Sequence, residues 1–262
     1  MHTILSGERN WLAISLGVVH ALLACACGGG GSGTAMSDSP PPVTAVPTPT
    51  PPPPPPPPPV QNPAPVCETR DVYTLCVTLQ DARVDDATVS RMEELFFDVY
   101  PRLVERFNRA APLSVYFVIG PSDHIAYVIG NTATYRADWL IQNPEDYDVV
   151  VHEVMHIVQS YSSSPGWITE GLADYVRHYY GVNNAATGWD LQMPAGFSYT
   201  NGYGVAARFF IWVEARYDIE LVEALDAAAR AGSYHDVFWI LQTGKSLDEL
   251  WAQYVANPAM PQ

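Results

Sequence analysis

Residues 149–161 read V-V-V-H-E-V-M-H-I-V-Q-S-Y, and this stretch decides what kind of domain the chain can form. As a helix, it places His152 and His156 four residues apart on one face, with Glu153 beside them. The surrounding residues are almost all apolar, which predicts a buried helix. Burying two imidazoles and a carboxylate is costly unless each finds a partner. A zinc ion held by both ring nitrogens, with the glutamate facing a bound water, satisfies all three groups. The alternative is a buried helix whose histidines bond to ordinary backbone groups.

A second group of acidic residues begins at Glu170, fourteen positions after His156. Catalytic zinc takes three protein ligands, and two histidines with one glutamate are a common set, so Glu170 is the candidate third ligand. Asp174 lies four residues further on the same helical face, where its carboxylate can accept the second ring N–H of a ligand histidine. Residues 162–166 (S-S-S-P-G) predict a turn that lets the two helices pack antiparallel and face each other.

Four sequence blocks in the same order resemble the plant basic secretory protein (basic secretory peptidase) family and its bacterial relatives. The blocks are H-E-V-M-H-I-V-Q, P-G-W-I-T-E-G-L-A-D-Y-V-R, N-G-Y-G-V-A-A-R-F-F and G-K-S-L-D-E-L-W-A-Q-Y, within residues 84–257. The E-x-x-x-D after H-E-x-x-H is also similar to glutamate-zincin metallopeptidases in general. The resemblance implies that His152, His156 and Glu170 are zinc ligands and that Glu153 is the catalytic carboxylate. This chain departs from the family pattern in being strongly acidic and in having a short connection between the two helices.

These features predict a zinc metallopeptidase, in particular an endopeptidase, that cleaves protein or peptide substrates with Zn²⁺ as its cofactor. Glu153 would take the proton from the attacking water and pass it to the leaving amine. Tyr203, flanked by glycines, is the preferred hydrogen-bond donor for the oxyanion, and His178 is the alternative. The rival hypothesis is an inactive, surface-displayed binding lipoprotein that keeps zinc as a structural site. Glu153 argues against it, because a structural site needs no general base.

The composition excludes some partners. The chain has 28 acidic and 13 basic residues, a formal net charge of −15. Such a surface repels nucleic acid and anionic lipid, so neither is an expected partner. It is the surface of a well-solvated protein, and we expect a monomer.

The N-terminal region predicts export. Residues 11–24 form an apolar run of signal-peptide length, so residues 1–24 are the expected signal peptide. The run ends in L-L-A-C, which resembles a bacterial lipoprotein cleavage box with Cys25 as the lipidated residue, although Cys27 is a second candidate. Two or more acyl chains would anchor the protein stably in a membrane, at the bacterial outer membrane or cell surface. The alternative is ordinary cleavage and full secretion.

A linker at residues 25–66 follows the signal peptide. Its first part is rich in glycine and serine, and its second part contains nine consecutive prolines at positions 51–59. The prolines alone would form a polyproline II rod of about 28 Å. The composition is typical of a spacer between a membrane anchor and a folded domain.

Residues 67–262 are predicted to form one metallopeptidase domain with an α+β, zincin-like fold, in which a small mixed sheet packs on helices and an all-helical part follows. Cys67 and Cys76 flank a possible hairpin, and in an exported protein a disulfide between them is expected. Strands are predicted at residues 72–79, 113–119, 125–129 and 132–135. The resemblance makes residues 125–129 the candidate edge strand that binds substrate backbone.

The expected helices follow from periodicity and capping signals. A long helix at residues 86–108 carries Pro101, where it should bend. The zinc helix should begin with Asn143 as N-cap and Pro144 as its first residue. Its partner should span 167–180 and end at Gly181. After a loop at 188–201, helices are predicted at 203–217, 219–231, 234–242 and 247–256, the last with a capping box of Ser246 and Glu249.

Overall fold

The computed structural model describes residues 63–191, 196–217 and 219–260. The predicted signal peptide, the lipidation site at Cys25 and almost all of the proline-rich linker lie outside the described residues. Within the described residues, no helix combines the length and apolar character needed to span a membrane.

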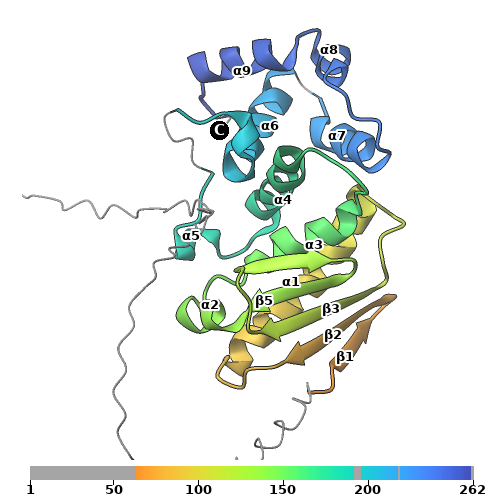
Figure 1. Ribbon diagram of the computed structural model, residues 1–262, viewed down its shortest axis with the longest axis vertical. Helices are drawn as coiled ribbons and strands as arrows, with labels where there is room; N and C mark the ends of the chain where they lie inside the picture. The colour runs from red at the N-terminus through yellow and green to blue at the C-terminus, as the bar shows by residue number, and fades with distance from the viewer. Residues whose placement is uncertain (1–62, 192–195, 218, 261–262) are drawn as a thin grey trace, which may run out of the picture. The chain divides into compact units, whose positions relative to one another are not determined.

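Five strands form one mixed sheet in the order β1-β2-β3-β5-β4 (Figure 1). The three central strands run parallel, and the two edge strands run antiparallel to their neighbours. The bounds are β1 (Val66–Arg70), β2 (Tyr73–Leu79), β3 (Ser114–Gly120), β4 (Ala126–Ile129) and β5 (Thr132–Arg136). The four predicted strands are therefore present, each with ends within one residue of the prediction. β1 and β2 form a hairpin in which Cys67 stands opposite Cys76, with their sulfur atoms bonded at 2.03 Å.

Helices α1 (Asp86–Arg106) and α3 (Val149–Gln159) pack against each other and cover one face of the sheet (Figure 1). Asp85 caps α1 by accepting the Ala87 backbone N–H, and Pro101 lies within the helix. The sheet meets the helices with alternate side chains that are fully buried, among them Leu75, Val115, Phe117 and Ile119. Each such apolar side chain contributes roughly 1.5–3 kcal/mol by burial. The core therefore fixes α3 against the sheet.

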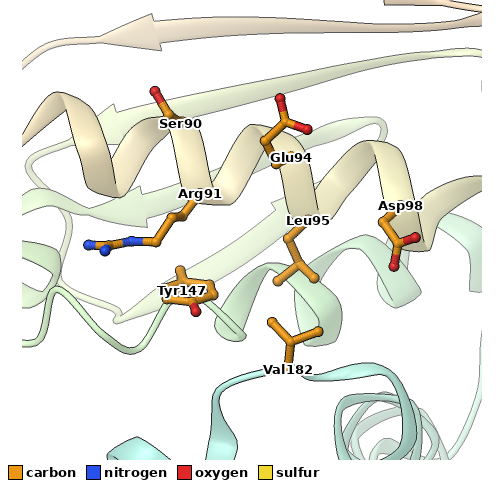
Figure 2. Close-up of a pocket in the computed structure, with 7 residues that line it drawn as sticks. All are labelled: Ser90, Arg91, Glu94, Leu95, Asp98, Tyr147 and Val182. Carbon is orange, nitrogen blue, oxygen red and sulfur yellow. The ribbon is translucent and has the colours of Figure 1, made fainter.

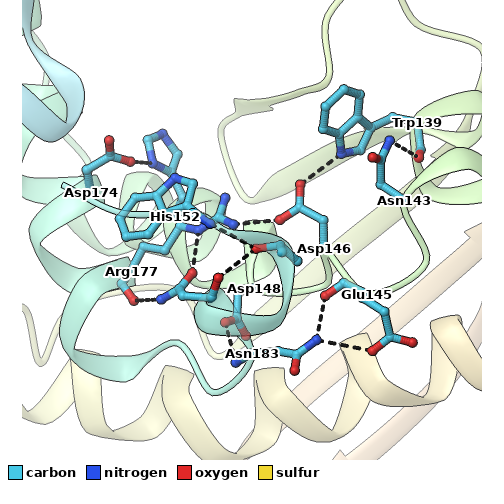
Figure 3. A network of polar contacts seen from close by, with 12 residues as sticks. Trp139, Asn143, Glu145, Asp146, Asp148, His152, Asp174, Arg177 and Asn183 are labelled. Atoms are coloured by element: carbon cyan, nitrogen blue, oxygen red, sulfur yellow. Dashed lines mark hydrogen bonds and ion pairs between the residues drawn. The ribbon is translucent and has the colours of Figure 1, made fainter. Parts of the chain in front are cut away.

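The predicted start of the zinc helix was wrong. Asn143 is the C-cap of a short unpredicted helix, α2 (Ala137–Gln142), and its side-chain amide donates to the Trp139 carbonyl at 3.0 Å. The following segment is held by tertiary contacts instead of helix hydrogen bonds (Figure 3). Asp146 accepts hydrogen bonds from the Trp139 indole and the Arg177 guanidinium. Asp148, the residue before α3, accepts two backbone N–H groups of residues 182 and 183. The Asn-Pro pair thus ends one helix and does not begin the next.

Helix α4 (Gly166–Tyr180) follows α3 after a short connection, as predicted. The left-handed residue at the end of α3 is Ser160, with φ of 47°. Gly181 closes α4 as predicted, but its φ of −66° is not left-handed. A larger residue does not fit at position 181, because a Cβ there would lie 2.6 Å from the Arg177 carbonyl and 2.4 Å from the Asn184 amide nitrogen.

The remaining described chain is helical. It contains α5 (Asn184–Thr187), a 3₁₀ turn (Tyr199–Asn201), α6 (Tyr203–Tyr217), α7 (Leu221–Arg230), α8 (Val237–Thr243) and α9 (Leu247–Ala256). The bounds of α6 and α9 match the prediction, and the capping box of Ser246 and Glu249 is present. α7 begins two residues later than predicted, and α8 begins three residues later. The 3₁₀ turn lies within the predicted loop at 188–201. All described strands precede α3 and only helices follow it, so the mixed α+β architecture is confirmed.

Candidate metal centre

The three predicted metal ligands lie together where α3 faces α4. Their ligand atoms are all within 4.8 Å of one another. The Nε2 atoms of His152 and His156 are 3.1 Å apart. Glu170 Oε2 lies 3.2 Å from Nε2 of His152 and 3.6 Å from Nε2 of His156. The packing of the two helices thus brings together residues that are distant in the sequence.

The spacing of these three atoms fits a tetrahedral zinc site. Zinc–nitrogen bonds of about 2.0–2.1 Å imply edges of roughly 3.3 Å between neighbouring ligand atoms. The observed separations of 3.1, 3.2 and 3.6 Å lie around that value. Two imidazole nitrogens and one carboxylate oxygen are also donors that zinc prefers.

The electrostatics of the group favour a bound cation. Burial by itself lowers the pKa of His152, but hydrogen bonds to Asp174 and Glu170 outweigh it and raise the pKa to about 10. Burial raises the pKa of Glu170, but its bonds to His152 and His156 dominate and lower it to about 2. The side chains therefore stabilise positive charge at the point where the two ring nitrogens converge.

Asp174 is the outer partner of His152, as the sequence predicts. Its Oδ1 lies 2.7 Å from His152 Nδ1, and its side chain is buried (Figure 3). In the neutral ring, a carboxylate that accepts the Nδ1–H leaves the lone pair of Nε2 directed toward the ligand group. The contact therefore fixes the orientation of the ring, with Nε2 on the side of His156 and Glu170.

Glu153 is buried next to the ligands on α3, with 5% of its surface exposed. Its Oε2 has no hydrogen-bond partner among the described residues. Burial raises the pKa of this carboxyl, while the two histidines lower it. A carboxylate with a free oxygen and a raised pKa is suited to accept a proton.

Tyr203 lies beside His152 and is 55% exposed. Its ring is nearly parallel to that of His152, with 6.1 Å between centroids. Burial raises the pKa of the phenol, and Glu170, Asp174 and Glu153 raise it further. The residue has a φ of 47°, which is uncommon for a non-glycine residue and costs of order 1–3 kcal/mol.

The alternative donor, His178, is placed differently. It is exposed, and its ring packs against Tyr179 with centroids 5.0 Å apart. Burial of part of the ring lowers its pKa. No described hydrogen bond or ring contact joins it to the three ligand residues, whereas Tyr203 stacks on one of them. Of the two candidates, Tyr203 is therefore the one that lies beside the ligand group.

The candidate substrate strand, β4, is an edge strand, and α3 packs beside it. Its outward side chains Tyr127 and Ile129 are 37% and 73% exposed. An exposed edge has free backbone groups that can pair with an extended peptide.

A separate groove of about 470 Å³ lies where α1 meets the segments before α3 and after α4 (Figure 2). It contains none of the three ligand residues. Its two acidic side chains, Glu94 and Asp98, are paired with Arg70 and Arg102. The groove is lined by Ser90, Arg91, Glu94, Leu95, Asp98, Tyr147 and Val182.

Two polar residues near the site, Gln159 and Arg177, were not predicted from the sequence. Gln159 contacts His156, and its position three residues later in H-E-V-M-H-I-V-Q was a usable signal, because residues i and i+3 share a helix face. Arg177, one turn after Asp174, is buried and donates a hydrogen bond to Asp146 (Figure 3). Its guanidinium lies over the Trp189 ring, 4.6 Å from the centroid. It joins α4 to the segment that precedes α3, a contact that no local pattern indicates.

A family model described as "Peptidase of plants and bacteria" matches residues 104–254, and the chain belongs to this family. The resemblance to the basic secretory proteins of plants and their bacterial relatives is thereby confirmed. No curated protein has a matching sequence.

Among solved structures, the matches include M1 zinc metallopeptidases. One is a mutant two-domain enzyme bound to L-tryptophan, with 12% identity, a TM-score of 0.48 and coverage of 77% of this chain and 53% of the other. Another, from Deinococcus radiodurans, has 13% identity, a TM-score of 0.46 and coverage of 77% and 52%. The chain therefore spans about half the length of these solved structures.

Proposed function

We propose that this chain is a zinc-dependent endopeptidase that cleaves peptide bonds in protein or peptide substrates. Its membership of a peptidase family supports the reaction class. The observation that carries the proposal is the convergence of His152, His156 and Glu170 beside Glu153, whose buried Oε2 has no hydrogen-bond partner among the described residues. A site with only a structural metal would not need that carboxylate.

In this proposal His152, His156 and Glu170 hold the metal, and Asp174 orients His152. Zinc bound there would act as a Lewis acid toward the scissile carbonyl and would acidify a water molecule. Glu153 takes the proton from that water and delivers it to the leaving amine.

The remaining residues act on the substrate. Tyr203 donates a hydrogen bond to the oxygen that gains negative charge, and β4 holds the substrate backbone by strand addition. Both roles agree with the exposure of Tyr203 at the ligand group and with the edge position of β4.

The cellular setting is a further proposal that rests on sequence alone. The L-L-A-C box supports a lipid anchor at Cys25, with the linker holding the domain away from a bacterial outer membrane or cell surface. Full secretion is the alternative. The acidic surface supports a monomer that does not bind nucleic acid.

The test compares Glu153→Gln with His156→Ala in the purified protein. Glu153→Gln should keep zinc and lose about 10²–10⁴-fold in the rate of hydrolysis, because it removes only the general base. His156→Ala should lose the metal as well. Zinc is measured by elemental analysis, and activity by hydrolysis of a denatured protein with and without chelator. Undiminished activity of Glu153→Gln would refute the mechanism. Zinc binding without turnover in the unmutated protein would favour the inactive binding lipoprotein.

A further inference from the structure

Gln159 is the last residue of α3 and is 1% exposed. Its side-chain amide makes two contacts. Oε1 lies 2.8 Å from Nδ1 of His156, and Nε2 donates to the backbone carbonyl of Thr169 at 2.9 Å. One buried side chain therefore touches a metal ligand on α3 and the backbone of α4.

The second contact fixes the orientation of the amide. The carbonyl oxygen of Thr169 can only accept a hydrogen bond, so the NH₂ group of Gln159 must face it. Oε1 then faces His156, and because an amide oxygen also only accepts, Nδ1 of His156 must carry the hydrogen. In the neutral form of the ring, the lone pair is consequently on Nε2. That is the atom 3.1 Å from His152 Nε2 and 3.6 Å from Glu170 Oε2.

The same amide also fixes the position of α4. Thr169 immediately precedes Glu170, so the bond from Gln159 holds the backbone next to the third ligand. The end of α3 is itself anchored, because the Arg230 guanidinium donates to the carbonyls of Val158 and Gln159, each at 3.2 Å. Because Gln159 is buried, water cannot easily replace either of its bonds.

We propose that Gln159 is a positioning residue of the metal centre, which fixes the tautomer of His156 and holds Glu170 at ligand distance. This inference rests on the zinc-dependent function proposed above. The two histidines are thus oriented by different chemistry. His152 has a carboxylate partner, Asp174, whereas His156 has an amide, because its partner must also donate to a carbonyl on α4.

The experiment uses Gln159→Met and Gln159→Glu. Methionine has a similar length but provides neither contact. Glutamate keeps an acceptor for Nδ1–H but cannot donate to Thr169. Gln142→Met is the matched control, because Gln142 is also the last residue of a helix, α2, and is exposed. Asp174→Asn is the reference for loss of the other outer partner.

Two quantities are measured on each protein. Zinc affinity is obtained by competition with a chromophoric chelator. The tautomer of His156 is obtained from ¹⁵N-histidine NMR of the metal-free protein. Gln159→Met should weaken zinc binding about 10–100-fold, as loss of an outer partner typically does, and should give a mixture of tautomers. Gln159→Glu should weaken zinc binding but keep the Nδ1–H tautomer. Gln142→Met should match the unmutated protein in both.

Two outcomes would overturn the inference: zinc affinity of Gln159→Met within threefold of the Gln142→Met control, or an unchanged tautomer in Gln159→Met. If Gln159→Met does not fold, retention of full zinc affinity by Gln159→Glu would overturn the role in holding α4. Failure of the proposed function is a different result, namely a protein with unmutated Gln159 that binds no zinc or hydrolyses nothing. The tautomer measurement needs neither metal nor activity.

Discussion

Gly171 is the position at which the packing of α4 on α6 can be tested most directly. It follows the candidate ligand Glu170, and a Cβ built there would lie 2.6 Å from the Cβ of Ala206 and 2.8 Å from the Phe210 ring. The Cβ of Ala206 is attached to the α6 backbone and cannot rotate away. Gly171→Ala must therefore move the helices apart by roughly 0.8 Å to reach ordinary contact distance.

The expected cost combines two opposing effects. Overpacking a core costs about 1–3 kcal/mol, and the better helix propensity of alanine offsets up to about 1 kcal/mol of it. Gly166→Ala is the control, because it is also in α4 but its added Cβ would have no neighbour within 4 Å. Gly166→Ala should therefore be stabilised by the higher helix propensity of alanine alone. The free energy of unfolding of Gly171→Ala should therefore be about 1–3 kcal/mol below that of Gly166→Ala.

Urea and thermal unfolding of the chelator-treated proteins measure this difference. For a domain of this size, 1–3 kcal/mol corresponds to a melting temperature lower by about 2–12 °C. Because Glu170 moves with the backbone of Gly171, a shift near 1 Å should also reduce turnover by up to about 100-fold. If Gly171→Ala is as stable as Gly166→Ala, α4 and α6 do not approach as closely as described. The idea that this helix contact positions Glu170 would then be refuted.

Two further predictions concern a buried carboxyl and the oxyanion donor. Burial raises the pKa of Asp226 from 3.8 to about 6, although Arg230 and Tyr161 stabilise its charged form. The folded state therefore holds this proton more tightly, and the resulting stability is complete below about pH 4 and is lost as the pH rises through 6, by up to about 3 kcal/mol. In urea unfolding between pH 4 and 7, the stability advantage of the unmutated protein over Asp226→Asn should fall with rising pH, and a constant or rising difference contradicts the assignment. Tyr203→Phe should lower kcat about 10²–10³-fold with zinc affinity unchanged, because the ring that stacks on His152 remains and only the hydroxyl donor is lost. A kcat within threefold of the unmutated value would exclude this phenol as the donor.

The sequence predicted those elements whose signals are local. The four helices after the predicted loop follow from periodicity and from caps such as the Ser246–Glu249 box, which depend on residues a few positions apart. Asn143 and Pro144 misled the prediction for the same reason. An Asn-Pro pair is compatible with a helix end as well as a helix start, and the choice was made by contacts of Asp146 with Trp139 and Arg177.

Helix geometry determined, from sequence alone, that His152 and His156 share one face and that Glu170 and Asp174 share another. These relations depend on backbone hydrogen bonds between residues four apart, so they hold wherever the helices form. Only the tertiary structure decided that the two faces meet with Glu170 Oε2 at 3.2 and 3.6 Å from the two histidine Nε2 atoms. That separation depends on side-chain packing between segments distant in the chain, which no local spacing encodes. The same packing gave Gln159 its partner on α4.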